Sequence, residues 1–176
     1  MIKNIKFIII IFFSLFIFFI FLKGLEKPNN YLPEKNLNKI ETNLLFKKLH
    51  DQNQIPLEDL INNNNFSIIN IWASWCLPCR DEHVYLINLK KINNLNIIGV
   101  SYRDKKSNAI KFLNDLGNPY SDVLLDKKGQ IAIDWGVYGI PETFVVNSNG
   151  IIKYRQAGPI TKKIYRKINS LIKEIK

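Results

Sequence analysis

An almost uninterrupted apolar stretch lies near the N-terminus of the chain. From Phe7 to Leu22 every residue is Phe, Ile or Leu except one serine. Ile5 and the stem of Lys6 lengthen this stretch toward the roughly 20 residues that span a hydrocarbon core. A core helix of a soluble protein would keep a polar face, which this segment lacks. The pattern therefore predicts a transmembrane helix within residues 1–23.

A cleaved signal peptide is the alternative interpretation of this segment. Signal peptides have a shorter apolar region that ends in small residues at the cleavage site. Bulky residues here continue to Leu22, and Lys23–Glu26 offers no such site, so we expect an uncleaved anchor. The flanking positive charges are nearly balanced, but a short N-terminus inside and a long translocated domain are the commoner result. In a Gram-negative bacterium, the rest of the chain would then lie on the periplasmic side of the inner membrane.

Residues 24–40 follow the anchor and contain Pro28, Pro33 and several asparagines, without sustained apolar periodicity. This composition is typical of a linker. We therefore expect one folded domain over residues 41–176, in which no internal repeat is visible.

The pattern of residues 41–176 alternates between strands and helices. Phe66–Trp72 is a continuous β-branched and aromatic run, as expected for a central strand buried on both faces. The order of strands and helices predicts an α/β fold, with a mixed sheet and helices on both faces. The expected elements are a hairpin of Thr42–Leu49 and Asn53–Leu57 with Pro56 at an edge, strands at Phe66–Trp72, Leu95–Ser101 and Val123–Leu125, helices at Leu77–Ile92 and Lys105–Leu116, a hairpin of Thr143–Val146 and Ile151–Tyr154, and a helix from Pro159 to Ile175.

Composition narrows the class of protein. The chain is 47% hydrophobic and 23% charged, which excludes a disordered protein. Two cysteines are too few for a disulfide-stapled scaffold. The net charge of +10 comes mostly from Lys, and we interpret it as a compositional bias on a solvated surface rather than as a nucleic-acid site.

The segment Cys76-Leu77-Pro78-Cys79 lies where a buried strand ends and a helix begins. A C-x-x-C that opens a helix places two thiols one turn apart. The first sulfur lies at the helix N-terminus, where unpaired N–H groups and the helix dipole stabilise an exposed thiolate. Such a thiolate attacks a substrate disulfide, and the second thiol resolves the mixed disulfide. We therefore predict that Cys76 is the nucleophile and Cys79 the buried resolving partner, with Pro78 tolerated in the first helical turn.

A zinc site and a purely structural disulfide are the alternatives for this pair. A four-ligand zinc site would need His50 and His83, the only two histidines. His83 lies four residues after Cys79 on the same helix, and this spacing does not let it complete a tetrahedral zinc site with the two cysteines. A structural disulfide that closes so small a loop removes little chain entropy. The redox interpretation is therefore favoured, with no metal.

Three stretches together carry a resemblance to a known family. They resemble the membrane-anchored thiol:disulfide interchange proteins of cytochrome c maturation, the DsbE/CcmG family, over roughly residues 66–158. The resemblance implies a thioredoxin fold in the periplasm and a dithiol kept reduced by a membrane thiol reductant, without a cofactor. The implied task is to reduce the haem-binding cysteines of apocytochrome c, or a partner thiol protein. The stretches are Trp72–His83 (WASWCLPCRDEH), Gly117–Tyr120 (GNPY) and Gly136–Phe144 (GVYGIPETF).

The resemblance also implies roles for residues around the cysteines. Pro141 would be a cis proline facing the C-x-x-C, although on local grounds alone a proline at the start of a strand is usually trans. The backbone of Ile140 would pair with an extended substrate. Trp75 would lie at the rim and contact partners together with Pro78. Trp72 is expected mainly in the core.

Two carboxylates are candidates for the acid–base work. Thioredoxins carry a buried Asp where this chain has Asn70, which cannot transfer protons. Glu82 would lie on the helix near the sulfurs, and Glu142 resembles the active-site acid of the family. A carboxylate near a thiol raises the pKa of the thiol and can act as its base. The alternatives are that Glu82 is a solvated helix residue and Glu142 a surface charge at the strand edge.

Arg80 and His83 are expected on the helix surface rather than in the chemistry. Two further hypotheses stay open beside a dedicated maturation reductase. One is a broader periplasmic thioredoxin-like oxidoreductase, which could also run as an oxidant. The other is a non-catalytic thioredoxin-fold adaptor.

Overall fold

The computed structural model describes residues 2–26, 38–51 and 54–175. The chain divides into two compact units, residues 1–34 and 35–176. The first unit contains the helix α1 (Ile2–Glu26). Among the described residues, α1 is the one helix long and apolar enough to cross a membrane, over Ile5–Lys23. It extends slightly beyond the predicted anchor.

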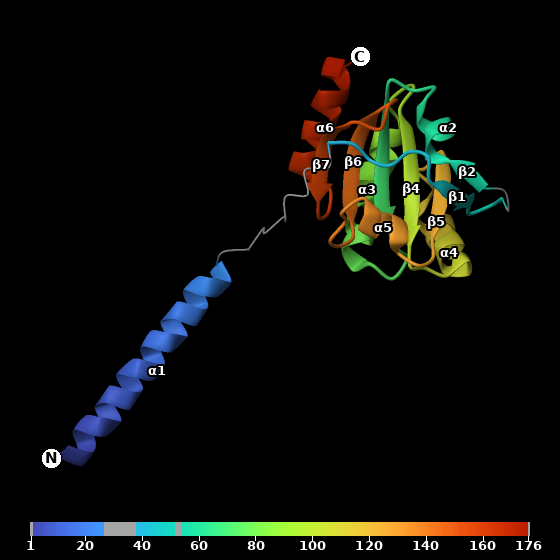
Figure 1. Cartoon of the computed structure of the whole chain (residues 1–176). Helices are drawn as coiled ribbons and strands as arrows, with labels where there is room; N and C mark the ends of the chain where they lie inside the picture. Colours follow the sequence, from blue (N-terminus) through green and yellow to red (C-terminus); the bar gives the residue numbers. More distant parts are fainter. Residues whose placement is uncertain (1, 27–37, 52–53, 176) are drawn as a thin grey trace. The chain divides into compact units, whose positions relative to one another are not determined.

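The second unit is built on a seven-stranded mixed sheet (Figure 1). Its strand order is β2-β1-β5-β4-β3-β6-β7, in which β3, β4 and β5 are parallel neighbours and the remaining pairs are antiparallel. The predicted α/β fold with a mixed sheet is confirmed. The strands are β1 (Leu45–Lys48), β2 (Gln54–Pro56), β3 (Phe66–Trp72), β4 (Asn96–Tyr102), β5 (Asp122–Asp126), β6 (Glu142–Asn147) and β7 (Ile152–Ala157).

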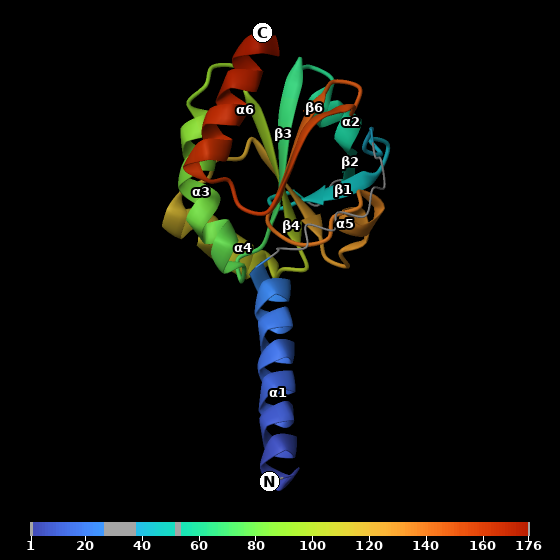
Figure 2. The ribbon, with the colours of Figure 1, turned by 90° about the vertical axis from the view of Figure 1, so that its left-hand side faces the viewer.

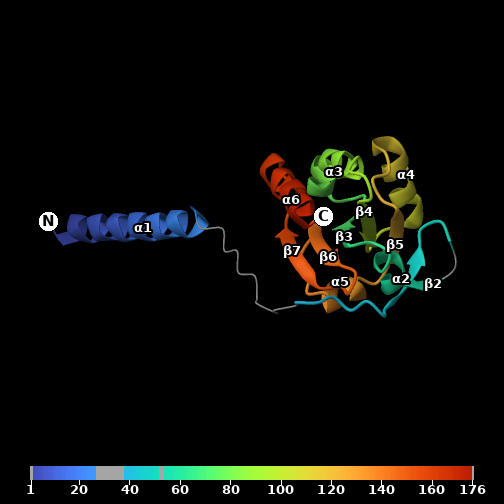
Figure 3. The same ribbon diagram turned by 90° about the horizontal axis from the view of Figure 1, so that it is seen from above.

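Helices cover both faces of this sheet, as Figure 3 shows. On one face, buried side chains of α3, α4 and α6 form a core with Ile68 and Trp72 of β3. On the other face, α2 and α5 pack over Ile69 and Ile71. The central strand β3 is therefore buried on both sides, as its sequence predicts. The helices are α2 (Leu57–Ile61), α3 (Leu77–Lys90), α4 (Lys106–Leu116), α5 (Gln130–Asp134) and α6 (Lys162–Ile175).

The structure differs from the sequence predictions mainly at the edges of the domain. The short helices α2 and α5 were not expected, because about one turn of helix is too short to show a period. The N-terminal hairpin is shorter than predicted, although Pro56 does lie on the edge strand β2. Lys39 bridges to Ile151 and Ile40 is buried, so contacts of the folded domain begin inside the predicted linker. Residues 27–37 of that linker lie outside the described residues.

The sheet topology brings four chain segments to one end of the domain. Because β3, β4 and β5 are parallel, the loops that follow them lie at the same edge (Figures 1 and 2). The antiparallel strand β6 begins there, since Glu142 pairs with Ile71 near the end of β3. The cysteines and the predicted cis proline therefore meet at this end.

Candidate active site

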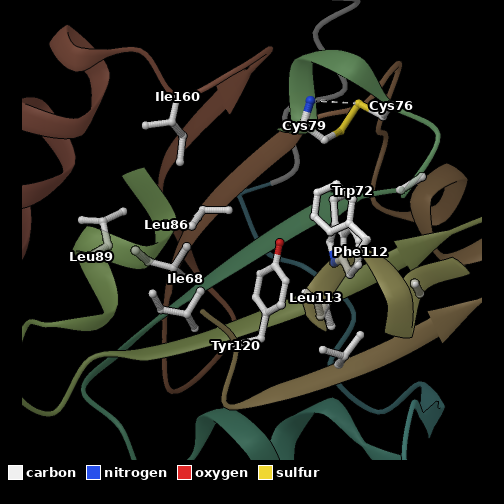
Figure 4. Close-up of a cluster of buried hydrophobic side chains, with 14 of the residues drawn as sticks. Ile68, Trp72, Cys76, Cys79, Leu86, Leu89, Phe112, Leu113, Tyr120 and Ile160 are labelled. Carbon is white, nitrogen blue, oxygen red and sulfur yellow. Dashed lines mark hydrogen bonds between the residues drawn. A yellow bond between two sulfur atoms is a disulfide. The ribbon is translucent and has the colours of Figure 1, made fainter. Parts of the chain in front are cut away.

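Cys76 and Cys79 form a disulfide at the N-terminus of α3. Cys76 is the N-cap residue with an extended backbone, and its Sγ accepts a hydrogen bond from the backbone N–H of Cys79 at 3.1 Å (Figure 4). Pro78 stands in the first turn, where its missing N–H leaves no helical bond unmade. The predicted pairing of two sulfurs one turn apart is present.

The exposure of the two cysteines differs from the prediction. Cys76 is 5% exposed and Cys79 is 2% exposed in the disulfide form, so both are buried. They belong to the core cluster that contains Trp72 and Phe112 (Figure 4). The prediction of an exposed Cys76 is therefore wrong for this disulfide state, in which both cysteines pack in the core cluster. Trp72 is in the core as expected.

The exposed part of the motif is formed by Trp75, Leu77 and Pro78. Trp75 is 59% exposed, as expected for a rim residue. Its indole N–H donates to the carbonyl oxygen of Arg103 at 3.3 Å. An apolar surface therefore borders the disulfide and is held in place from the loop after β4.

A carboxylate that sequence reasoning missed holds the loop before Cys76. Asp104 accepts hydrogen bonds from the backbone N–H of Ser74 at 2.6 Å and from its hydroxyl at 2.9 Å. The signal available in the sequence was topological: Asp104 follows β4, and loops after parallel strands share one edge of the sheet. Asp104 therefore fixes the segment that leads to Cys76.

The peptide bond between Ile140 and Pro141 is cis, as predicted. Pro141 is buried, directly before β6, and its carbonyl oxygen accepts from the N–H of Gly158 at 3.0 Å. Ile140 is half-buried and packs against the core clusters on both faces of the sheet. This places the cis segment beside the end of β3, next to the loop that leads to Cys76.

A fully buried polar network connects β3, α3 and β6 with the segments that precede β5 and α6. Asn70 of β3 donates through Nδ2 to Glu82 Oε1 at 2.8 Å and to the hydroxyl of Thr143 at 3.0 Å. The hydroxyl of Tyr120 donates to Asn70 Oδ1 at 2.8 Å. Glu82 Oε2 accepts from the backbone N–H of Ile160 at 2.7 Å. Every polar group of Asn70 and Glu82 thus has a partner.

Burial governs the protonation of Glu82. Desolvation raises the pKa of Glu82 from 4.5 to about 7, although the hydrogen bonds from Ile160 and Asn70 pull the pKa down. The side chain is inaccessible to solvent, which excludes the alternative of a solvated helix residue. Glu82 lies one turn after Cys79 on α3. The carboxyl therefore exchanges its proton near neutral pH within the core that holds the sulfurs.

Glu142 is also buried, in an ion pair with Arg155 of β7. Burial raises the pKa of Glu142, and the hydrogen bond and charge of Arg155 oppose this effect. The guanidinium also donates to the carbonyl oxygen of Gly136 at 2.6 Å. Strand alternation places Glu142 on the side of Phe144, the sheet face opposite Thr143 and the disulfide cluster.

His83 is buried, contrary to the surface position expected for it. It is 3% exposed, and Nε2 lies 2.8 Å from the carbonyl oxygen of Gly117. Its ring meets Phe112 edge-on with the centroids 5.0 Å apart. Burial, and to a lesser degree the charge of Arg80, lower the pKa of His83. Arg80 is exposed as expected, with its guanidinium 5.0 Å above the Phe112 ring.

A disulfide that caps a helix, with a cis proline at the same end of a mixed sheet, defines the thioredoxin-like class of redox proteins. The Redoxin family profile matches residues 27–171 of this chain. The chain belongs to this family and, within it, to the DsbE thiol:disulfide interchange proteins. The relatives in this group are named for thiol:disulfide interchange, and the two cysteines that such exchange needs are present here as the Cys76–Cys79 pair.

Relatives of known name support this assignment. The thiol:disulfide interchange protein CycY of Rhizobium leguminosarum bv. viciae is 49% identical over 105 residues, which cover 60% of this chain and 56% of CycY. The chain thus spans little more than half of that relative. DsbE of Haemophilus influenzae is 42% identical over 134 residues, or 76% of this chain and 68% of DsbE. The crystal structure of a DsbF homologue from Corynebacterium diphtheriae shares the fold, with a TM-score of 0.66 at 19% identity over 84% of this chain and 96% of the homologue.

Proposed function

We propose that this chain is a membrane-anchored periplasmic reductant of cytochrome c maturation. It would reduce the haem-binding cysteines of apocytochrome c, or a partner thiol protein, and receive electrons from a membrane thiol reductant. The observation that carries the redox part is the Cys76–Cys79 disulfide at the N-terminus of α3 with Glu82 buried one turn away. The direction of electron flow and the maturation role come from the resemblance to the DsbE/CcmG family.

In the proposed reaction, the Cys76 thiolate attacks one sulfur of a substrate disulfide and forms a mixed disulfide, while the other substrate sulfur leaves as a thiolate. The Cys79 thiolate then attacks Cys76 Sγ and releases the second substrate thiol. Two electrons pass to the substrate, and the chain ends in the disulfide form seen here. The N–H of Cys79 that points at Cys76 Sγ supports the assignment of Cys76 as the nucleophile, because it stabilises negative charge on that sulfur.

Glu82 is the proposed base for the resolving thiol. A group that accepts a proton near neutral pH needs a pKa close to the operating pH, and burial brings the pKa of Glu82 to about 7. Asn70 occupies the position at which thioredoxins carry an acid, and here it orients the Glu82 carboxyl instead. Glu142 is proposed as a second acid of the site. Because it pairs with Arg155 on the sheet face opposite the disulfide cluster, it would act on the adjoining Pro141 segment and not directly on the sulfurs.

Substrate binding is assigned to the surface around the disulfide. Trp75 and Pro78 are exposed, and Ile140 with Pro141 borders them at the same end of the sheet. An extended substrate would lie along the backbone of Ile140. The helix α1 would hold the domain at the membrane, close to a membrane-bound electron donor.

The equilibrium potential of the Cys76–Cys79 pair tests this proposal. The full chain in non-ionic detergent is equilibrated against dithiothreitol and glutathione buffers and read out by thiol alkylation. A value near roughly −270 mV, as in thioredoxin, is expected. A value near roughly −120 mV, as in DsbA, would instead make the chain an oxidant. Support of cytochrome c maturation by a Cys76→Ser/Cys79→Ser chain would favour the adaptor hypothesis.

A further inference from the structure

Five exposed cations gather beside the disulfide. Two of them lie in the loop after β4 and a third is the first residue of α4, while the loop between β5 and α5 carries the other two. We call this group the basic rim. Its members are Arg103, Lys105, Lys106, Lys127 and Lys128.

The two loops are joined, so the cations form one surface rather than two. The backbone N–H of Arg103 donates to the carbonyl oxygen of Asp126 at 2.9 Å, and its Nε donates to that of Lys128 at 3.2 Å. Gly129 of the second loop lies against Tyr102 at the end of β4: a Cβ added to this glycine would stand 2.7 Å from the Tyr102 ring. This close approach packs the second loop against the first.

The carboxylates of the same loops are turned inward and leave the cations without counter-charge. Asp104 accepts both hydrogen bonds from Ser74. Asp126 is buried and accepts from the backbone N–H of Ala132 at 3.0 Å. Among the described residues the ion pairs join Lys48 to Asp122, Lys111 to Asp115 and Arg155 to Glu142. No cation of the basic rim takes part in them.

The basic rim is connected directly to the redox motif. The carbonyl oxygen of Arg103 accepts from the indole of Trp75, the residue before Cys76. A polypeptide whose cysteine is joined to Cys76 must therefore pass close to these loops. Charges within roughly 8–10 Å of each other still interact at physiological ionic strength.

We infer that the basic rim binds an acidic polypeptide segment that flanks the substrate disulfide. The inference rests on the proposed function and adds a specificity that this function does not require. The occupant is a polypeptide because the bond that forms at Cys76 is made to a protein sulfur, and it is acidic because the exposed charges of both loops are positive. The rim raises the rate at which such a disulfide meets Cys76, while the exchange step itself is unchanged.

The test uses the reduced full chain in non-ionic detergent and three peptides that share one Cys-x-x-Cys disulfide. The residues flanking the disulfide are Glu and Asp in the first peptide, Ser in the second and Lys in the third. The rate of peptide reduction is measured by acid quench and thiol alkylation. We expect the acidic peptide to react about tenfold faster than the Ser peptide at low salt. This advantage disappears at about 1 M NaCl, where the screening length falls to about 3 Å.

Two variants locate the effect. The rim variant changes Lys105, Lys106, Lys127 and Lys128 to Gln, and Arg103 is kept because it holds Trp75 and the second loop. The rim variant should lose the preference for the acidic peptide and keep the wild-type rate with the Ser peptide. The matched control changes Lys153, Lys162, Lys163 and Lys173 to Gln, four exposed cations of β7 and α6. It should keep the preference.

Equal wild-type rates with all three peptides would overturn the inference, and so would an equal loss in both variants. The proposed function fails in a different way, as a chain that does not reduce the Ser peptide at all. In that case the rate at which the oxidised chain oxidises the same three peptides in their dithiol form is measured instead. The preference for acidic flanks is expected there too, and its absence would count against the rim.

Discussion

At the scale of single residues, the site depends on how Glu82 is kept in the core. A buried carboxylate without partners would lose several kcal/mol of solvation. Asn70 and the N–H of Ile160 each supply one hydrogen bond to it, and Tyr120 fixes the orientation of the Asn70 amide. Desolvation still outweighs these bonds, so the pKa of Glu82 rises to about 7. The Asn70 amide cannot transfer a proton itself, but it holds the Glu82 carboxyl, which can.

This arrangement predicts a dependence of stability on pH. The folded chain keeps a proton on Glu82 up to about pH 7, whereas the unfolded carboxyl releases it near 4.5. Because the folded state binds more protons between these values, the free energy of unfolding should fall as pH rises through them, by up to about 3 kcal/mol. Glu82→Gln should remove this part of the dependence. Urea unfolding of the oxidised chain from about pH 5 to about pH 8 measures it.

The control for this experiment is Glu58→Gln, which changes an exposed carboxylate of α2. Its profile should follow that of the wild type. If Glu82→Gln also ran parallel to the wild type, the protonation assigned to Glu82 would be wrong. The oxidised form is used so that no thiol titrates.

The sequence could predict the cysteines but not the surroundings of their helix. The spacing and the strand-to-helix position identify Cys76 and Cys79, because that chemistry is local. Glu82 and His83 belong to a polar run that has the composition of a helix surface. They are buried because α3 packs in one layer with α4 and α6. The burial of this side of α3 depends on the tertiary packing of the three helices, which no local sequence pattern indicates.

At the scale of elements, two side-chain contacts between elements hold the segments around the disulfide and the cis proline in place. The loop after β4 holds the segment before Cys76 through Asp104, and β7 supports the start of β6 through Arg155. The periodicity of the long strands and helices was sufficient to predict them. The short α2 and α5, and both supporting contacts, depend on segments distant in sequence.

Asp104→Ala should loosen the active-site loop. The change leaves the half-buried N–H of Ser74 without its acceptor, which costs about 1–3 kcal/mol. We expect a lower urea midpoint and slower exchange with glutathione disulfide. Asp115→Ala is the control, because it removes only an exposed pair with Lys111, worth about 0.3–0.5 kcal/mol. Equal effects of the two changes would show that Asp104 does not hold the loop.

Arg155→Leu should destabilise the junction of β6 and β7. It leaves the buried carboxylate of Glu142 without a counter-charge, at a cost of about 3–5 kcal/mol when the acid is ionised. Loss of Arg155 raises the pKa of Glu142 further, so the variant should lose stability as pH rises and recover it in acid. The double variant Glu142→Leu/Arg155→Leu should regain most of the loss. Urea unfolding at the two pH extremes distinguishes this from a simple packing defect, which pH would not change.

At the scale of the whole molecule, the chain joins two units that differ in where their apolar residues lie. The helix α1 carries apolar side chains on every side, and among the described residues it alone satisfies the length and composition of a membrane span. The second unit buries its apolar residues in two cores against one sheet. The sequence predicted the apolar helix, because an apolar run without a polar face is as local a signal as C-x-x-C.

The predicted uncleaved anchor has consequences that fractionation can measure. The full chain expressed in a Gram-negative host should remain with the membrane after alkaline carbonate, because burying a span of this length far exceeds the affinity of a surface contact. Its N-terminal sequence should still begin with residues of α1. In spheroplasts, added protease should digest the second unit while a cytoplasmic marker stays intact. A shorter chain in the soluble periplasmic fraction would instead identify a cleaved signal peptide, and protection from protease would place the disulfide on the cytoplasmic side, where thiols are kept reduced.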